Sequence, residues 1–325
     1  MSLFTPLIAA LVTFFLTRLL ISSKAANKVQ DMPNERSLHS TPVPRIGGVG
    51  LMAGVLCGWA LLFSSLTWWV VLPLLILFVV SLLDDMHNLP VKQRLWVHLI
   101  AATVLVGGSG LFAQQGVAIA LAVLLFAVWL TNLYNFMDGS DGLAGGMALF
   151  GFGMYGIAAW LNHNTPLVLL NLCIAAAAAS FLYYNFHPAK IFMGDAGSIP
   201  LGFLVAAMGL LGWQQGSWSL WFPFLVFSPF IVDASITLLK RSLRGDKVTE
   251  AHCEHYYQHL IQMGWGHRNV ALAEYVLMLA VGISALWLLN HPFPWQMLLA
   301  WGIVYACLMS LLDVRWNKFK RGANV

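Results

Sequence analysis

Long apolar stretches occupy most of the chain and constrain its fold more than any other feature. A helix that spans a bilayer needs about 20 mainly apolar residues. Eleven stretches approach or meet this length: 3–22, 46–66, 68–83, 94–112, 116–136, 142–161, 166–184, 198–213, 219–239, 269–290 and 294–312. Only 9% of the residues are charged, whereas soluble domains carry roughly 25%. The sequence therefore predicts an all-α polytopic transmembrane bundle of about eleven helices, with 1–325 forming one integral membrane domain.

The positions of the basic residues predict the orientation of this bundle. Lysine and arginine accumulate in the loops on the cytoplasmic side of a membrane. With the N-terminus outside, all 17 Lys and Arg residues lie in inside segments or at an inner helix end. These inside segments are 23–45, 84–93, 137–141, 185–197, 240–268 and 313–325. We therefore expect a periplasmic N-terminus and a cytoplasmic C-terminus.

A flippase or transporter of an anionic lipid-linked sugar is an alternative for a chain of this kind. Transporters keep ionisable groups near the middle of the bilayer, where alternating access requires them. The acids of this chain cluster at the inner surface, and the deepest, Asp233 and Glu274, lie within about two turns of their inner helix ends. The distribution favours an enzyme that works at the cytoplasmic face.

The first inside segment contains candidate phosphate-binding residues. Arg36, His39 and Arg45 are hydrogen-bond donors suited to phosphate oxygens. Gly47 and Gly48 begin the second predicted helix, where exposed backbone N–H groups can approach an anion. The alternative is an ordinary basic loop kept inside by its charge.

A pair of acids, Asp84 and Asp85, ends the third predicted helix, and Lys92 and Arg94 follow it. Neighbouring helical residues point about 100° apart, so we expect the two carboxylates to have different tasks. An acidic pair at a membrane surface suits a divalent cation or the activation of a nucleophile. The alternative is a solvated helix end.

Two amides and two acids recur at a spacing of three residues in the next inside segment: Asn132, Asn135, Asp138 and Asp141. Such polar side chains are costly beside lipid, which favours a functional role. We expect Gly139 and Gly142 to break the helix so that the four side chains converge.

Two further inside segments contain candidate ligands. Lys190 precedes a Gly-Asp-Ala-Gly-Ser turn in which Asp195 offers hard oxygen atoms for magnesium. The longest inside loop contains His252 and His255 among arginines and lysines, which favours binding of an anion. A basic loop that faces lipid headgroups is the alternative there.

Together these motifs resemble the polyprenyl-phosphate N-acetylhexosamine-1-phosphate transferases, from about Asp31 to Gly264. That family includes the phospho-MurNAc-pentapeptide transferase of peptidoglycan synthesis and the transferases that start O-antigen. The motifs that carry the resemblance are Asp84-Asp85, the run from Asn132 to Gly142, and KIFMGDAGS at 190–198. Many members have a His-x-His or triple-His signature in the last large loop, where this chain has HYYQH at 255–259. This departure favours the O-antigen-initiating subgroup.

The resemblance implies an activity and its partners. The donor would be a UDP-N-acetylhexosamine, with UDP-GlcNAc, UDP-QuiNAc and UDP-FucNAc as open choices. The acceptor would be undecaprenyl phosphate, UMP would leave, and Mg²⁺ or Mn²⁺ would be the cofactor. The location would be the bacterial inner membrane, with the active site facing the cytoplasm. Membrane lipids and a second copy of the chain are further candidate partners, and nucleic acid is not expected.

We assign candidate roles on this basis. Asp195 would hold the magnesium, with Asp138 or Asp141 nearby, and either Asp84 or Asp85 would act on the acceptor phosphate as base or orienting group. His255 is the remaining candidate catalytic residue and would contact phosphate, as would Arg45 and Lys92. Asn132 and Asn135 would contact the nucleotide or order the metal ligands. The other candidate substrate-binding residues are Arg36, His39, Lys190 and His252.

Overall fold

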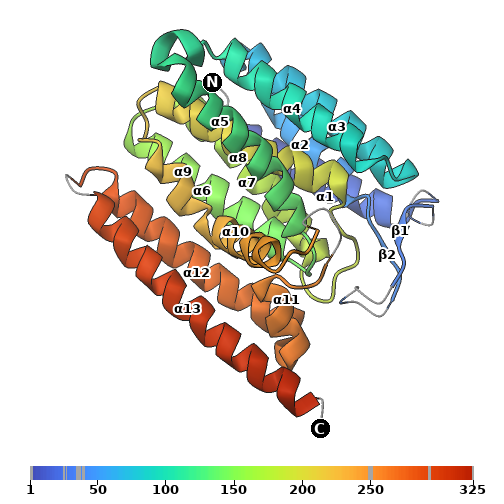
Figure 1. Cartoon of the computed structure of the whole chain (residues 1–325). Helices are drawn as coiled ribbons and strands as arrows, with labels where there is room; N and C mark the ends of the chain where they lie inside the picture. The colour runs from blue at the N-terminus through green and yellow to red at the C-terminus, as the bar shows by residue number, and fades with distance from the viewer. Residues whose placement is uncertain are drawn as a thin grey trace.

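The computed structural model describes residues 3–24, 26, 28–33, 38, 41–247, 252–291 and 294–323. The described chain is almost entirely helical (Figure 1). Its α-helices are α1 (Thr5–Ile21), α2 (Gly47–Ala60), α3 (Trp68–His87), α4 (Val91–Gly108), α5 (Leu111–Phe136), α6 (Leu143–Leu161), α7 (Thr165–Asn185), α8 (Asp195–Gln214), α9 (Trp221–Val226), α10 (Ser228–Leu243), α11 (Tyr256–Leu260), α12 (Gly266–Leu288) and α13 (Pro294–Ala323). Two short antiparallel strands, β1 (Gln30–Asp31) and β2 (Val43–Pro44), pair in the segment between α1 and α2.

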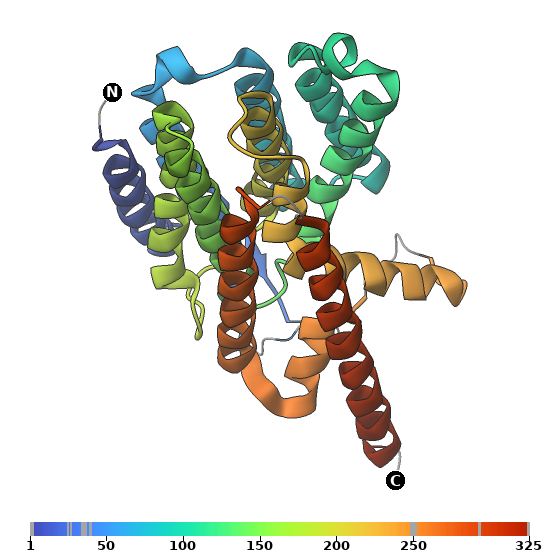
Figure 2. The same ribbon diagram turned by 90° about the vertical axis from the view of Figure 1, so that its left-hand side faces the viewer.

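The predicted polytopic helical bundle is confirmed. Seven of the described helices are long and apolar enough to cross a membrane: α3, α5, α6, α7, α8, α13 and the run Tyr256–Leu288 that contains α12. Helices α1 and α2 are shorter and also apolar. Most of these helices run in roughly the same direction, and α1 begins near one end of the bundle while α13 ends at the other (Figure 2).

Helix α8 forms the centre of the bundle and is buried along nearly its whole length. It packs against α3 on one side and α5 on the other. Small residues allow this close approach: a Cβ atom at Gly202 would lie 2.6 Å from the carbonyl oxygen of Leu130 on α5. Tight contacts of this kind stabilise helix pairs in lipid, where apolar surface gains nothing by leaving water.

The predicted span 219–239 is wrong as a single helix. It divides into α9 and α10, with a break at Phe227, and α10 runs across the direction of its neighbours (Figure 2). Pro229 lies in the first turn of α10. A proline has no N–H for the preceding turn and clashes with its carbonyl, so one continuous helix is interrupted there.

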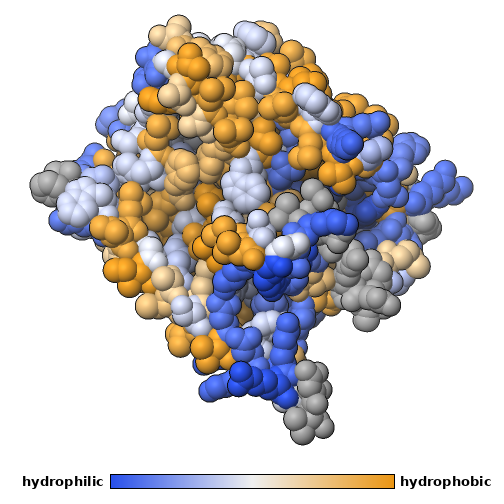
Figure 3. Space-filling model, in the orientation of Figure 1, coloured by the Kyte–Doolittle hydropathy of each residue, from blue (hydrophilic) through white to orange (hydrophobic). Residues whose placement is uncertain are grey.

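Polar residues gather at one end of the molecule. In Figure 3 apolar side chains cover most of the visible surface, whereas hydrophilic side chains collect around the β1–β2 ribbon and the C-terminal end of α13. The apolar surface suits lipid, and the hydrophilic end suits an aqueous face. The segments that carry the candidate site residues lie at this hydrophilic end.

Candidate active site

Four carboxylates from three segments meet at the hydrophilic end of the bundle. Asp84 and Asp85 belong to the last turn of α3, Asp138 to the loop after α5, and Asp195 to the first turn of α8. Helix α8 places them together because it contacts both α3 and α5. Their side chains nevertheless have different partners.

Asp85 caps the N-terminus of α8. Its Oδ1 accepts a hydrogen bond from the backbone N–H of Asp195 at 3.1 Å, and its Oδ2 accepts one from Ala196 at 2.9 Å. Gly194 leads into this turn with a φ of 69°, and a Cβ there would lie 2.9 Å from Oδ2 of Asp85. Only glycine fits that position, and the carboxylate satisfies N–H groups that have no partner within the helix.

Asp84 faces a different set of groups. Its Oδ1 accepts a hydrogen bond from the backbone N–H of Leu89 at 2.6 Å, and its Oδ2 accepts one from Arg94 at 2.9 Å. The same Arg94 nitrogen lies 3.3 Å from Oδ2 of Asp195. Neighbours on one helix turn thus point to different partners, as their angular offset implies.

Asn135 orients Asp195. Its Nδ2 donates to Oδ1 of Asp195 at 2.8 Å and lies 2.9 Å from the hydroxyl of Ser198. Asp195 therefore receives Asn135 on one oxygen and Arg94 on the other. A carboxylate held at both oxygens keeps a fixed orientation.

Asp138 lies in an environment rich in negative charge. Burial and the nearby carboxylates of Asp195 and Asp85 raise the pKa of Asp138 well above its usual range. Crowding of this kind disfavours the ionised form unless a cation lies close by.

The donor chemistry of this cluster fits magnesium, which binds hard carboxylate oxygens. Among the described residues, no group of three or more His, Cys, Asp or Glu side chains already has the spacing of a metal site. The guanidinium of Arg94 lies between Asp84 and Asp195 instead. The residues would hold the ion through Asp195, Asp84 and Asp138 once Arg94 leaves these oxygens.

A cavity of about 580 Å³ opens beside the carboxylates. Its polar lining consists of Arg94, His98, Asn132, Asn135, His252, His255 and Gln258. The remaining lining is apolar and comes mainly from α4 and α5. A ligand with a charged head and an apolar tail matches this division.

His98 and Asn132 form a hydrogen-bonded pair in the cavity. The Nδ1 atom of His98 lies 3.2 Å from Oδ1 of Asn132, whose own Nδ2 donates to the carbonyl of Val128. Since the amide oxygen can only accept, Nδ1 of His98 carries the proton. Its Nε2 is then an acceptor.

His255 is buried and held by an acid from α10. Its Nδ1 lies 3.2 Å from Oδ1 of Asp233. The backbone N–H of Tyr256 donates to the same oxygen, and that of Tyr257 donates to Oδ2. An acid at Nδ1 fixes the tautomer and orientation of an imidazole. The ring lines the cavity, so its Nε2 is the nitrogen available to a ligand.

His252 packs beside His255, with ring centroids 4.9 Å apart. Burial, followed by the charges of His255 and Arg241, lowers the pKa of His252 to about 4. The imidazole is therefore neutral near pH 7. His252 can donate or accept a hydrogen bond in the cavity, but it brings no positive charge to an anion there.

The expected anion site at the start of the second helix is wrong. The N–H groups of Gly47 and Gly48 donate to the carbonyls of Phe192 and Met193 at 2.9 and 2.7 Å. A Cβ at Gly48 would collide with the backbone of Gly197. These glycines join the starts of α2 and α8, which fixes the loop that precedes Asp195.

The expected convergence of the four residues at spacing three is also wrong, although the helix does break between Phe136 and Leu143. Asn135 reaches Asp195, whereas Asn132 faces His98. Asp141 turns away to His187, whose Nδ1 is 2.7 Å from its Oδ2. The rotation along α5 and the turn at Gly142, with a φ of 75°, send these side chains to different places.

The other candidate cations differ in how they relate to the carboxylates. Arg45 donates to the backbone carbonyl of Asp85 at 3.0 Å and to the Asn88 side chain at 3.3 Å, and thereby fastens the end of α3. Lys92 and Lys190 are exposed. Arg36 and His39 lie outside the described residues.

Arg94 and His98 line the site although the sequence motifs assign them no role. They lie four positions apart on α4, so they share one helix face. In the sequence they resemble an ordinary basic helix start. Their spacing of four residues was a signal, because it places both side chains on the same side of α4 and so toward the same neighbouring helix.

Comparisons with known proteins indicate one family of transferases. The family model described as Glycosyl transferase family 4 matches residues 67–212. The chain is 30% identical over 304 residues to the probable undecaprenyl-phosphate N-acetylglucosaminyl 1-phosphate transferase of Bacillus subtilis, covering 86% of this chain and 84% of the relative. It is 29% identical over 326 residues to the decaprenyl-phosphate N-acetylglucosaminephosphotransferase of Mycobacterium leprae, covering 86% and 81%.

A third relative has a larger sugar substrate in its name. The chain is 25% identical over 316 residues to the phospho-N-acetylmuramoyl-pentapeptide-transferase of Staphylococcus saprophyticus, covering 87% of this chain and 97% of the relative. The region matched by the family model contains all four clustered carboxylates.

Proposed function

Since the chain belongs to the polyprenyl-phosphate N-acetylhexosamine-1-phosphate transferase family, we propose that it transfers a sugar 1-phosphate from a UDP-N-acetylhexosamine to undecaprenyl phosphate and releases UMP. The protein is a membrane phosphoglycosyltransferase of multi-pass architecture. The proposal goes beyond the family in naming the donor class, the lipid and the leaving group. UDP-GlcNAc is the first donor to test, because two of the relatives are named for N-acetylglucosamine.

The observation that carries the proposal is the cavity next to the carboxylates. Its polar groups, among them Arg94 and His255, lie beside the acids, whereas Val128 and Trp129 belong to its apolar wall. The phosphate of a lipid acceptor would bind at the polar groups, and its hydrocarbon chain would leave along α5. A water-soluble acceptor would have no use for the apolar wall.

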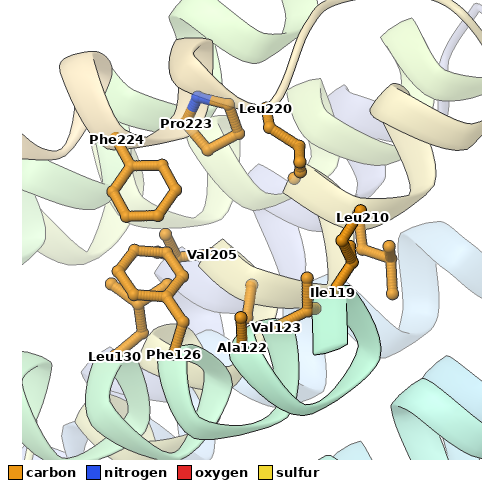
Figure 4. Close-up of a pocket in the computed structure, with 12 residues that line it drawn as sticks. Ile119, Ala122, Val123, Phe126, Leu130, Val205, Leu210, Leu220, Pro223 and Phe224 are labelled. Atoms are coloured by element: carbon orange, nitrogen blue, oxygen red, sulfur yellow. The ribbon is translucent and has the colours of Figure 1, made fainter. Parts of the chain in front are cut away.

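A second cavity lies farther along α5, toward its N-terminal end. It has a volume of about 220 Å³ and an almost wholly apolar lining from α5, α8 and α9 (Figure 4). Phe126 and Leu130 line it from α5, and Phe224 and Val205 face them. Leu130 is adjacent in sequence to Trp129, which lines the first cavity. The later isoprene units of the acceptor would pack here.

The residues of the site would act chiefly by positioning and by neutralising charge, as in other phosphoryl transfers. An oxygen of the lipid phosphate attacks the phosphorus atom that carries the sugar, and the bond from that phosphorus to the UMP oxygen breaks. A phosphate monoester has a second pKa near 6, so most of the acceptor is already ionised at neutral pH. His255 and Arg94 would orient its oxygens for the attack.

Magnesium bound at the carboxylates would neutralise charge on the donor pyrophosphate. Asn135 would keep Asp195 oriented toward it, and Asp85 would keep the α8 N-terminus in place. Both contacts keep the site residues in position, and they would persist throughout the reaction.

We place the active site at the cytoplasmic face of the bacterial inner membrane. The carboxylates lie at the hydrophilic end of the bundle, which also contains the basic inside segments. UDP-sugars are cytoplasmic, so this orientation gives the donor direct access. The product would start O-antigen or a related envelope polysaccharide, in line with the HYYQH loop.

The test is a nucleotide-release assay with purified protein, Mg²⁺ and undecaprenyl phosphate. The donors are UDP-GlcNAc, UDP-QuiNAc, UDP-FucNAc and, as a comparison, UDP-MurNAc-pentapeptide. We expect UMP only when the lipid is present, and a preference for a donor without peptide. Release of UDP would indicate transfer of the sugar alone and would refute the proposal. A flippase would release neither nucleotide.

A further inference from the structure

Arg94 links the two parts of the site. Its Nη1 lies 2.9 Å from Oδ2 of Asp84 and 3.3 Å from Oδ2 of Asp195, so a single nitrogen joins carboxylates of α3 and α8. The same side chain lines the cavity next to them. It therefore stands between the carboxylates and the space assigned to the substrate phosphates.

The side chain can change position without disturbing the core. Arg94 lies in the first turn of α4, and 31% of its side chain is exposed. Its contacts with the acids are ion pairs at the tip of a long flexible chain. Such a partly solvated pair contributes little to stability.

A divalent cation would compete with this guanidinium. Arg94 occupies Oδ2 of Asp84 and Oδ2 of Asp195, and an ion held by these two carboxylates would compete with it, because two cations close together repel each other. When the ion takes these oxygens, the guanidinium must move, and the cavity that it already lines is the adjacent space. Phosphate oxygens are good partners for it there, since arginine binds phosphate in bidentate fashion.

We propose that Arg94 is a positioning residue that exchanges partners during the reaction. It holds Asp84 and Asp195 together until a divalent cation binds them, and it then turns into the cavity to bind the phosphate of the substrate. This inference rests on the proposed function, from which it takes both the ion and the phosphate. The exchange makes binding of the ion favour binding of the substrate, because the displaced charge moves to the phosphate site.

The test is a Mn²⁺ titration of the purified protein without substrate, with the free ion measured by EPR. Arg94→Gln should bind Mn²⁺ roughly tenfold more tightly than wild type, because the competing charge is gone. Arg94→Met, which keeps the length of the side chain without its charge, should show the same gain. Arg315→Gln removes an exposed cation from α13 and should match wild type.

A second measurement follows the coupling. Saturating Mn²⁺ should strengthen the binding of a short-chain polyprenyl phosphate to wild type in calorimetry, and this gain should shrink severalfold in Arg94→Gln and Arg94→Met. Elution as a single species and an unchanged unfolding temperature would show that each variant is folded.

The outcomes separate the two proposals. Equal or weaker Mn²⁺ binding by either folded neutral variant, while wild type binds the ion, would overturn the role of Arg94 and leave the metal site standing. Absence of Mn²⁺ binding by wild type would overturn the metal part of the proposed function itself.

Discussion

Substitution of Asp85 by asparagine should destabilise the protein as well as inactivate it. The carboxylate is almost completely buried, with 1% of its side chain exposed, and it accepts N–H groups of Asp195 and Ala196 at 3.1 and 2.9 Å. Asparagine keeps one acceptor oxygen, but its NH₂ group opposes the other N–H. Loss of a helix cap costs about 0.5–2 kcal/mol, and loss of a negative charge at a helix N-terminus costs up to about 2 kcal/mol.

Asparagine also avoids burying a charge and, to a smaller extent, removes repulsion from Asp84, which offsets part of this cost, so we expect a net loss of about 2 kcal/mol. Asp84→Asn is the matched control. Its oxygen can still accept the N–H of Leu89, and the ion pair that it loses involves an Arg94 side chain that is 31% exposed. Such a pair is worth about 1 kcal/mol or less.

The assay is thermal unfolding in detergent, followed by tryptophan fluorescence, together with turnover. Asp85→Asn should unfold about 4 °C or more below wild type, whereas Asp84→Asn should stay within about 2 °C of it. Both variants should lose turnover. A wild-type unfolding temperature for Asp85→Asn, or a larger drop for Asp84→Asn, would refute the capping argument.

Three further predictions address the metal, the pH dependence and the topology. Asp195→Asn should lower turnover about a hundredfold or more while the protein stays folded, because a metal ligand is lost; near-normal turnover at saturating Mg²⁺ would contradict this role. The lowered pKa of His252, about 4, means that the unfolded chain binds a proton more readily, so stability should fall as pH drops from about 6.5 toward 4. His252→Gln should reduce that fall by about 1 kcal/mol, since the group is half-exposed; an unchanged pH slope in unfolding experiments would exclude His252 as its source. Reporter fusions placed in the predicted outer loops, after residues 115, 165 and 216, should read as periplasmic. A cytoplasmic signal at two of these positions would reverse the predicted orientation.

The helices of this protein could be predicted well from its sequence, because lipid demands long apolar stretches with satisfied backbone groups. The broken span at 219–239 shows the limit of that reasoning. Residues 219–239 are as apolar as their neighbours, and Pro229 could have produced a kink, as prolines often do in membrane helices. Whether α10 turns across the bundle depends on the helices that pack around it. The local sequence pattern does not contain this information.

The site was predictable in composition and less so in arrangement. The motifs located the carboxylates because charged groups are costly beside lipid and therefore usually have a functional role. The partners of these groups come from distant segments, as when Asp85 caps a helix 110 positions later. The motifs assign no role to Arg94 and His98 because only the packing of α4 against α3 and α5 gives them one.

The central claim is that the sugar moves together with a phosphate, and phosphorus labelling of the donor tests it most directly. UDP-GlcNAc labelled at the phosphorus next to the sugar would be incubated with the protein, Mg²⁺ and undecaprenyl phosphate, and the lipid and nucleotide products separated. We expect this label to enter the lipid, whereas a label at the phosphorus next to uridine should leave as UMP. Recovery of both labels in UDP, with unlabelled sugar on the lipid, would contradict it.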